Sequence, residues 1–128
     1  MAESKLLFTD TYEVQSGMAT QQYHIVALRA ANVINIASEK VHSSMLGVLQ
    51  TKPANPGNFG TVGIFGKSKV VAGAAITAGV FLTCNGSGRA VAVGSGDMAF
   101  GKALVAAGAD GQFITANIFH PFRWSGAV

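Results

Sequence analysis

The chain has 128 residues, the length of one domain of ordinary size, and a formal net charge of +3. Hydrophobic residues make up 49% of the sequence and charged residues only 12%, about half of the usual charged share. Because a monomer normally covers its surface with more charge than this, the composition argues against a chain that stands alone and predicts that a partner or sister subunits cover part of its exterior.

The N-terminal region, residues 1–22, is mostly polar and contains one apolar patch, formed by Leu6, Leu7 and Phe8. Free chain ends usually fray, so apolar side chains near an end are often held by a contact. We expect an extended N-terminal arm here. Two interpretations stay open: the arm docks on a neighbouring subunit, or it folds back onto its own core.

Short segments rich in β-branched and aromatic residues follow, and glycines separate them. Residues 23–28 and 32–36 are predicted strands. Residues 38–49 fit a helical period, although 45–50 fits a strand as well. The segment 52–58 contains two prolines and a glycine, so it is predicted to be a loop.

The second half of the chain continues with strands and tight turns. Further strands are predicted at 60–71, 80–84, 89–93, 98–106 and 112–119. The run Asn-Gly-Ser-Gly at 85–88 tolerates positive φ angles and predicts a β-hairpin between the strands that flank it. Strands spaced about ten residues apart with turns between them indicate a small β-barrel or β-sandwich. The expected fold class is therefore mainly β, with one domain over residues 23–118.

The C-terminal segment, residues 119–128, is an aromatic tail. Phe119, Phe122 and Trp124 lie within its first six residues. As for the N-terminal arm, docking on a neighbouring subunit and folding back onto the chain's own core both stay open.

A partial phosphate-binding motif occurs at residues 96–102. Its spacing matches a phosphate-binding loop up to Lys102, but Ala103 follows where Ser or Thr would hold a magnesium ion. The loop also contains Met98 and Phe100, and the segment behind it is too short for the helix that assists phosphate binding. We interpret the motif as a coincidence of a glycine-rich sequence and predict no nucleotide or other cofactor.

No set of residues in the sequence points to catalysis or to a metal site. His24, His42 and His120 are isolated, and none has metal-ligand spacing to another histidine, a cysteine or a carboxylate. Cys84 is the only cysteine, which excludes an internal disulfide and a cysteine-based metal cluster. The sequence has no Gly-x-Ser-x-Gly elbow. We predict no enzymatic activity.

The interval between Glu39 and Asp97 contains no acidic residue. Its cations are Lys40, Lys52, Lys67, Lys69 and Arg89. One interpretation is a surface that faces anions, either nucleic acid or an acidic protein lattice. The favoured alternative is a set of scattered solubilising cations, because nucleic-acid-binding proteins have a denser charge footprint. The apolar run 70–84 is shorter than the roughly 20 residues of a membrane-spanning helix, so neither nucleic acid nor membrane is a predicted partner.

The order of segments in the C-terminal half resembles a known family. These segments are Val-Val-Ala-Gly-Ala-Ala-Ile-Thr-Ala-Gly at 70–79, the strand 80–83, a glycine turn, the strand 89–93, Ala-Phe-Gly-Lys-Ala-Leu-Val-Ala-Ala-Gly at 99–108 and the strand 110–118, with a weaker echo at 17–28. In this order they resemble the small capsid decoration (cement) proteins of tailed bacteriophages. The resemblance implies a compact β-barrel or β-sandwich on the outside of the capsid, commonly a trimer that stiffens the shell.

The resemblance therefore implies a structural decoration protein whose partner is the major capsid protein. It also implies a homotrimer, made in the host cytoplasm and located on the exterior of the virion. The candidate contact residues for the capsid or for sister subunits are Leu6, Leu7, Phe8, Phe119, Phe122 and Trp124. The alternative function is a β-sandwich module that binds a receptor or a glycan, with Trp124, Phe122 and Tyr23 as its candidate platform.

Overall fold

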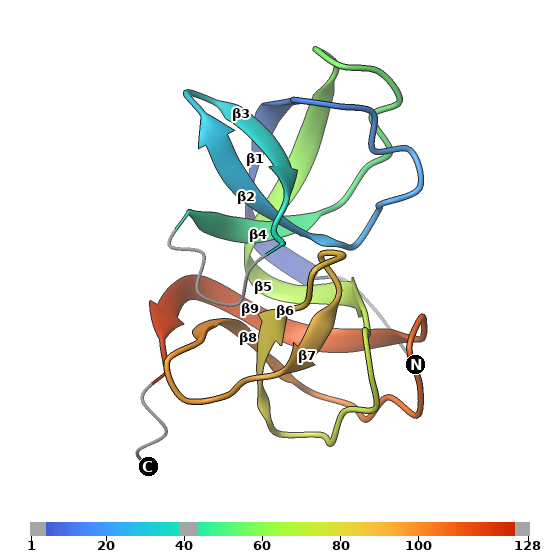
Figure 1. Ribbon diagram of the computed structural model, residues 1–128, viewed down its shortest axis with the longest axis vertical. Helices are drawn as coiled ribbons and strands as arrows, with labels where there is room; N and C mark the ends of the chain where they lie inside the picture. Colours follow the sequence, from blue (N-terminus) through green and yellow to red (C-terminus); the bar gives the residue numbers. More distant parts are fainter. Residues whose placement is uncertain (1–4, 39–43, 125–128) are drawn as a thin grey trace.

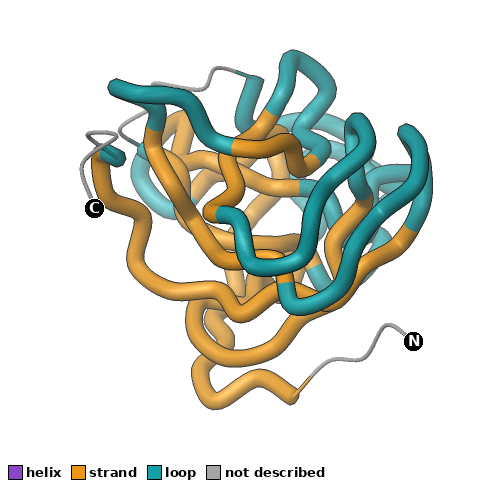
Figure 2. The backbone as a smooth tube through the Cα atoms, turned by 90° about the horizontal axis from the view of Figure 1, so that it is seen from below, coloured by secondary structure: helices purple, strands orange, loops and turns teal. Residues whose placement is uncertain are grey.

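The computed structural model describes residues 5–38 and 44–124, in which the chain forms strands and no helix (Figures 1 and 2). The strands are β1 (Lys5–Val14), β2 (Ile25–Ala30), β3 (Val33–Ile36), β4 (Met45–Leu49), β5 (Phe59–Val71), β6 (Phe81–Cys84), β7 (Ala90–Ala92), β8 (Met98–Ala103) and β9 (Phe113–Arg123). The prediction of a mainly β fold is confirmed. In the described ranges, nothing helical has the length and apolar character to cross a membrane.

Five strands close into a barrel, which forms the upper half of Figure 1. Hydrogen bonds connect β1 to β3, β3 to β2, β2 to β4, β4 to β5, and β5 back to β1. The β1–β3 pair is parallel, with Glu13 opposite Val33, and the other four pairs are antiparallel. Closure pairs the strand edges that an open sheet would leave exposed.

The long strand β5 belongs to both halves of the molecule. Residues 59–67 pair with β1 in the barrel, and residues 66–71 pair with β9. From β9 the sheet continues through β8 and β6 to β7, in the lower half of Figure 1. A single parallel bridge between Ala72 and Ala90 brings β7 back beside the end of β5. We call this lower part of the continuous sheet, from residues 66–71 of β5 through β9, β8 and β6 to β7, the second sheet. The bridge shows that it is strongly curled.

Apolar side chains fill both halves. The barrel is filled by the buried side chains of Val14, Met18, Val26, Ile34, Leu49 and Val62. A larger cluster joins the second sheet to the barrel, and Phe100 on β8 is its largest fully buried side chain. Burial of this apolar area drives folding of the chain.

Two glycines explain how closely β4 and β5 approach each other. A Cβ atom on Gly47 would overlap the carbonyl oxygen of Gly63 on the neighbouring strand. Glycine within a strand often marks such a close approach of another backbone.

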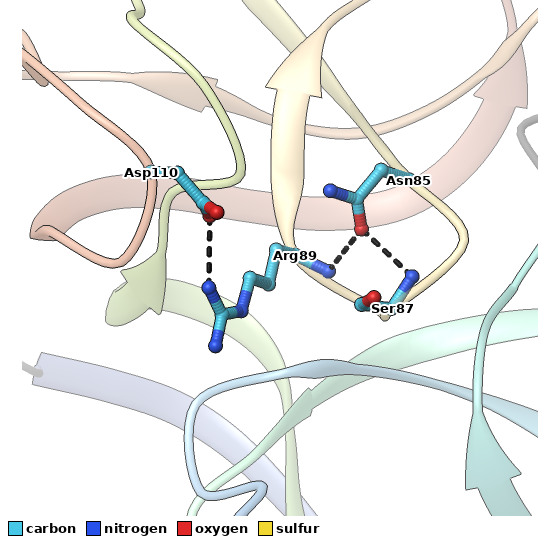
Figure 3. Close-up of polar contacts among 4 residues, drawn as sticks. All are labelled: Asn85, Ser87, Arg89 and Asp110. Atoms are coloured by element: carbon cyan, nitrogen blue, oxygen red, sulfur yellow. Dashed lines mark hydrogen bonds and ion pairs between the residues drawn. The ribbon is translucent and has the colours of Figure 1, made fainter.

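The predicted hairpin at 80–93 is confirmed, and polar contacts fix its loop (Figure 3). Asn85 Oδ1 accepts hydrogen bonds from the backbone N–H of Ser87, at 2.9 Å, and of Arg89, at 3.1 Å. Gly88 has a φ angle of 72°. Arg89 Nη1 lies 2.8 Å from Asp110 Oδ1, so an ion pair connects this loop to the turn before β9. Both side chains are partly exposed, and such pairs contribute only about 0–1 kcal/mol.

The described parts of both terminal segments take part in strands of their own chain. Residues 5–13 pair with β5, and β9 continues to residue 123 alongside β8. Each segment for which folding back or docking stayed open therefore pairs within the chain over its described part. The division into an arm at 1–22, a domain at 23–118 and a tail at 119–128 stays a prediction.

Candidate docking face

Four neighbouring strands place one row of side chains across the outside of the second sheet. Lys67 on β5 lies opposite Asn117 on β9, and Asn117 lies opposite Lys102 on β8. Lys102 in turn lies opposite Phe81 on β6. Directly paired residues of antiparallel strands project to the same side of a sheet, so these four side chains share one face. Lys67, Lys102 and Asn117 are exposed.

Three phenylalanine rings cluster at one end of this row. The ring centroids of Phe81 and Phe119 are 6.2 Å apart, those of Phe81 and Phe122 are 5.9 Å apart, and those of Phe119 and Phe122 are 5.7 Å apart. Phe122 is 41% exposed. Lys102 Nζ lies 5.7 Å from the centroid of Phe81, within the range of a cation–π contact. The cluster thus combines exposed aromatic area with a positive charge.

A second aromatic pair lies on the same side of β5. Phe65 precedes Lys67 by two residues, and burial alternates along this segment, so both side chains project outward. Phe65 is 41% exposed, and its ring centroid lies 6.1 Å from that of Phe8 on β1, which is 64% exposed. We call the whole surface the lysine–phenylalanine face. It consists of Phe8, Phe65, Lys67, Phe81, Lys102, Asn117, Phe119 and Phe122.

Among the residues that the structure describes, no carboxylate side chain belongs to the lysine–phenylalanine face. The acidic residues among the described ranges are Asp10, Glu13, Asp97 and Asp110. Asp10 and Glu13 lie further along β1, opposite Val62 and Phe59, and the two others lie in turns. Exposed apolar patches of this kind mark interaction sites, and aromatic residues are enriched at interfaces. The face therefore suits a protein surface that is apolar and acidic.

The structure brings three of the predicted contact residues into this face, namely Phe8, Phe119 and Phe122. Leu6 is half-buried and packs against the chain's own core. The side chain of Leu7 lies outside the described part of the structure. The role of these residues as contacts stays a prediction.

Trp124 is held through its backbone. Its backbone N–H donates to the carbonyl oxygen of Asp97, at 2.8 Å, and its carbonyl oxygen accepts from the N–H of Gly96, at 2.7 Å. Within the described residues, no ring contact joins Trp124 to another aromatic residue. Its part in docking also stays a prediction.

Sequence reasoning did not single out Phe65, Phe81, Lys102 or Asn117 as contact residues. Alternation in Phe-Gly-Lys-Ser-Lys at 65–69 gives the local signal that Phe65 and Lys67 share a side. The row across four strands depends on the register between β5, β9, β8 and β6, and no local pattern supplies that register.

The partial phosphate-binding motif is part of a strand. Residues 98–103 form β8, and Met98 and Phe100 are buried in the core. A phosphate-binding loop needs free backbone amides that wrap around the anion, whereas β8 uses its backbone to pair with β6 and β9. Lys102 therefore belongs to the outer face of a sheet.

His24 is the one histidine of the described ranges that is buried, with 6% of its area exposed. Loss of hydration lowers the pKa of His24 below its usual value, and the positive charge of Arg89 acts in the same direction. The hydrogen bond between Nδ1 and the carbonyl oxygen of Gln22, at 3.3 Å, opposes this shift in part. Within the part of the chain that the structure describes, no three acidic, histidine or cysteine side chains come together as metal ligands.

The lowered pKa predicts a pH dependence of stability. The unfolded chain protonates His24 near pH 6.5, while the folded chain does so only at lower pH. Below about pH 6.5 the unfolded state therefore binds more protons, and the contribution of His24 to stability falls as the pH falls toward the folded pKa. We expect the drop in Tm between pH 7.5 and pH 5.5 to be smaller for His24→Gln than for the wild type. Equal drops would contradict this assignment.

Two comparisons show which known proteins the chain resembles. The family model described as phage cement protein matches residues 9–118. The crystal structure of the head fiber gp8.5 N base of bacteriophage phi29 superposes with a TM-score of 0.65 at 24% identity, covering 87% of this chain and 92% of that chain. At that identity the likeness shows a shared fold. No curated protein matches the sequence. Because the family model spans most of the chain, including β2 to β8 in full, the protein belongs to the phage cement protein family.

Proposed function

We propose that this protein decorates the outer surface of a phage head, where its lysine–phenylalanine face docks on the major capsid protein and stabilises the shell. The observation that carries the proposal is an exposed aromatic and cationic face, to which no carboxylate of the described residues belongs, in a member of the cement family. The role is physical and not catalytic. The protein would be made in the host cytoplasm and would act on the exterior of the virion.

Burial of the phenylalanine rings supplies the main attraction. Full burial of one such side chain contributes about 1.5–3 kcal/mol, before the costs of association. Lys67 and Lys102 add attraction to acidic groups and orient the encounter. Each copy would hold two or more capsid subunits together, and many copies on one shell would reinforce one another through avidity.

The proposal includes a homotrimer at three-fold or quasi-three-fold positions of the shell. The low charged share of 12% supports it, since sister subunits would cover apolar surface that a monomer exposes. Leu6, Leu7 and Trp124 remain candidate contacts for such subunits. Mass measurement on the free protein and on decorated shells tests the assembly, and one copy per site would contradict it.

Thermal melting of expanded, undecorated shells tests the stabilising role. We expect saturating amounts of the purified protein to raise the melting temperature of the shells, because the docked copies must dissociate before capsid subunits separate. Shells incubated with buffer alone provide the baseline. If the protein binds the shells and their melting temperature does not change, the stabilising role is wrong and the decorating role stands. If the protein does not bind the shells, both roles are wrong.

A further inference from the structure

A hollow lies at the N-terminal end of β9, whereas the phenylalanine cluster lies near the C-terminal end of this strand. It has a volume of about 330 Å³ and is lined by Gln22, Tyr23, Lys69 and Phe113. Phe113 is the first residue of β9, whereas Phe119 and Phe122 lie near its other end. The volume is at the lower end of the range for small-molecule sites. None of its lining residues belongs to the lysine–phenylalanine face.

Two aromatic rings and a cation form the walls of the hollow. The rings of Tyr23 and Phe113 meet edge to face, with centroids 5.8 Å apart and an angle of 90° between their planes. Lys69 Nζ lies 5.6 Å from the centroid of Tyr23. Phe113 is 55% exposed, so a large part of its ring is open to solvent. An apolar ligand surface can therefore pack on Phe113 beside a positive charge.

Tyr23 is held in a strained backbone conformation. Its φ angle of 67° lies in the left-handed region, which a bulky side chain rarely adopts. Its N–H donates to the carbonyl oxygen of Leu49, at 2.7 Å, and its own carbonyl oxygen accepts from the N–H of Val71, at 3.1 Å. These bonds fix Tyr23 between β4 and β5. Strain of this kind persists where the surrounding structure imposes it, and it clusters at binding sites.

The hollow also contains polar groups that can receive a ligand. Gln22 Nε2 donates to the carbonyl oxygen of Gln50, at 2.8 Å, which anchors the amide. Among the described residues, neither Gln22 Oε1 nor the hydroxyl group of Tyr23 has a hydrogen-bond partner. Tyrosine hydroxyl groups that are partly buried usually find one. A ligand rich in hydroxyl groups would satisfy both atoms.

We infer that this hollow binds a uronic acid residue of an acidic polysaccharide. The apolar C–H face of the sugar ring packs on Phe113, its hydroxyl groups bond to Gln22 Oε1 and to the Tyr23 hydroxyl, and its carboxylate lies near Lys69. An acidic peptide fits less well. It can donate to Gln22 Oε1 only through its backbone N–H groups, and a glutamate side chain lacks the flat ring face that packs on Phe113. This inference goes beyond shell decoration and does not depend on it.

Titration of the full-length, isotope-labelled protein, followed by amide chemical shifts, tests the inference. The probes are a hyaluronan tetrasaccharide, which contains glucuronic acid, the neutral cellotetraose, and a tetraglutamate peptide. We expect saturable shifts at Tyr23, Lys69 and Phe113 with hyaluronan and about 10-fold weaker binding of cellotetraose. Absence of these shifts with hyaluronan, or equal binding of cellotetraose or tetraglutamate, would overturn the inference.

Two pairs of variants locate the site. Phe113→Ala should weaken hyaluronan binding at least about 10-fold. Phe59→Ala makes the same truncation at a phenylalanine outside the hollow, whose side chain is 68% exposed, and should leave binding unchanged. Lys69→Gln should also weaken binding, and Lys52→Gln, in the loop before β5, should not. Because none of the four substituted side chains is fully buried, the amide spectra of the four variants are expected to show an intact fold. Wild-type affinity in Phe113→Ala would rule out this hollow.

Discussion

Replacing both Lys67 and Lys102 with glutamate is expected to weaken binding to expanded shells by roughly 100-fold. The two side chains lie in one row of the sheet, separated by Asn117, and both are exposed. Charge reversal places carboxylates where the proposed partner surface is acidic, and like charges across an interface are strongly unfavourable. Co-sedimentation of the protein with shells at increasing protein concentration measures the affinity.

Lys52→Glu is the matched control for the single variants Lys67→Glu and Lys102→Glu. Lys52 is exposed in the loop between β4 and β5, away from the lysine–phenylalanine face. Lys52→Glu changes the net charge by the same amount as Lys102→Glu, so a general effect of net charge would affect both variants equally. We expect the control to bind like the wild type, and we expect wild-type binding to weaken with added salt. Equal losses of shell affinity in Lys52→Glu and Lys102→Glu would remove the electrostatic argument for this face.

Phe100→Ala should lower the free energy of unfolding by about 3–5 kcal/mol. Phe100 is fully buried on β8 and belongs to the cluster that joins the second sheet to the barrel. Truncation removes apolar contacts and leaves a cavity, because close-packed neighbours relax only in part. Urea denaturation measures the change.

Phe59→Ala serves as the matched truncation for this stability test. Phe59 begins β5 and is 68% exposed, so its loss should change the free energy of unfolding by no more than about 0.5 kcal/mol. The contrast separates burial from residue type. A loss below about 1 kcal/mol in Phe100→Ala would contradict the packing described for the core.

Local patterns in the sequence predicted most of the strands. The run 85–88 defined a hairpin because Asn85 and the following glycines suit a tight loop, and the structure confirms it. The segment 38–49 was ambiguous between helix and strand. Its residues 45–49 form a strand, β4, since they are buried between β2 and β5 and Gly47 permits close contact with β5, while residues 39–43 lie outside the described part of the chain. Tertiary packing decides such a segment where propensity does not.

The C-terminal end of β9 shows why a boundary was hard to predict. A proline normally ends a strand, and the strand predicted at 112–119 stopped short of Pro121. In the structure β9 continues to Arg123, because the register shifts between Ala99 and Gly101 of β8 and places Pro121 in an irregular stretch of pairing. A proline is tolerated in such a bulge. The strand predicted at 98–106 ends earlier, at Ala103, before the chain turns toward the bridge of Ala107 with Ile76.

The candidate docking face was only partly accessible to sequence reasoning. Phe8, Phe119 and Phe122 were chosen because apolar residues near chain ends need a contact. Phe81 and Lys102 were missed, because they join the face only through pairing between strands that are far apart in the sequence. Register is set by the whole sheet and is not visible in one segment.

An electron cryomicroscopy map of decorated shells tests the central claim most directly. The account predicts that the lysine–phenylalanine face lies against the major capsid protein, with Phe65 and Phe122 buried and acidic side chains of the shell near Lys67 and Lys102. A map in which this face points to solvent, while another surface of the protein contacts the shell, would contradict the account.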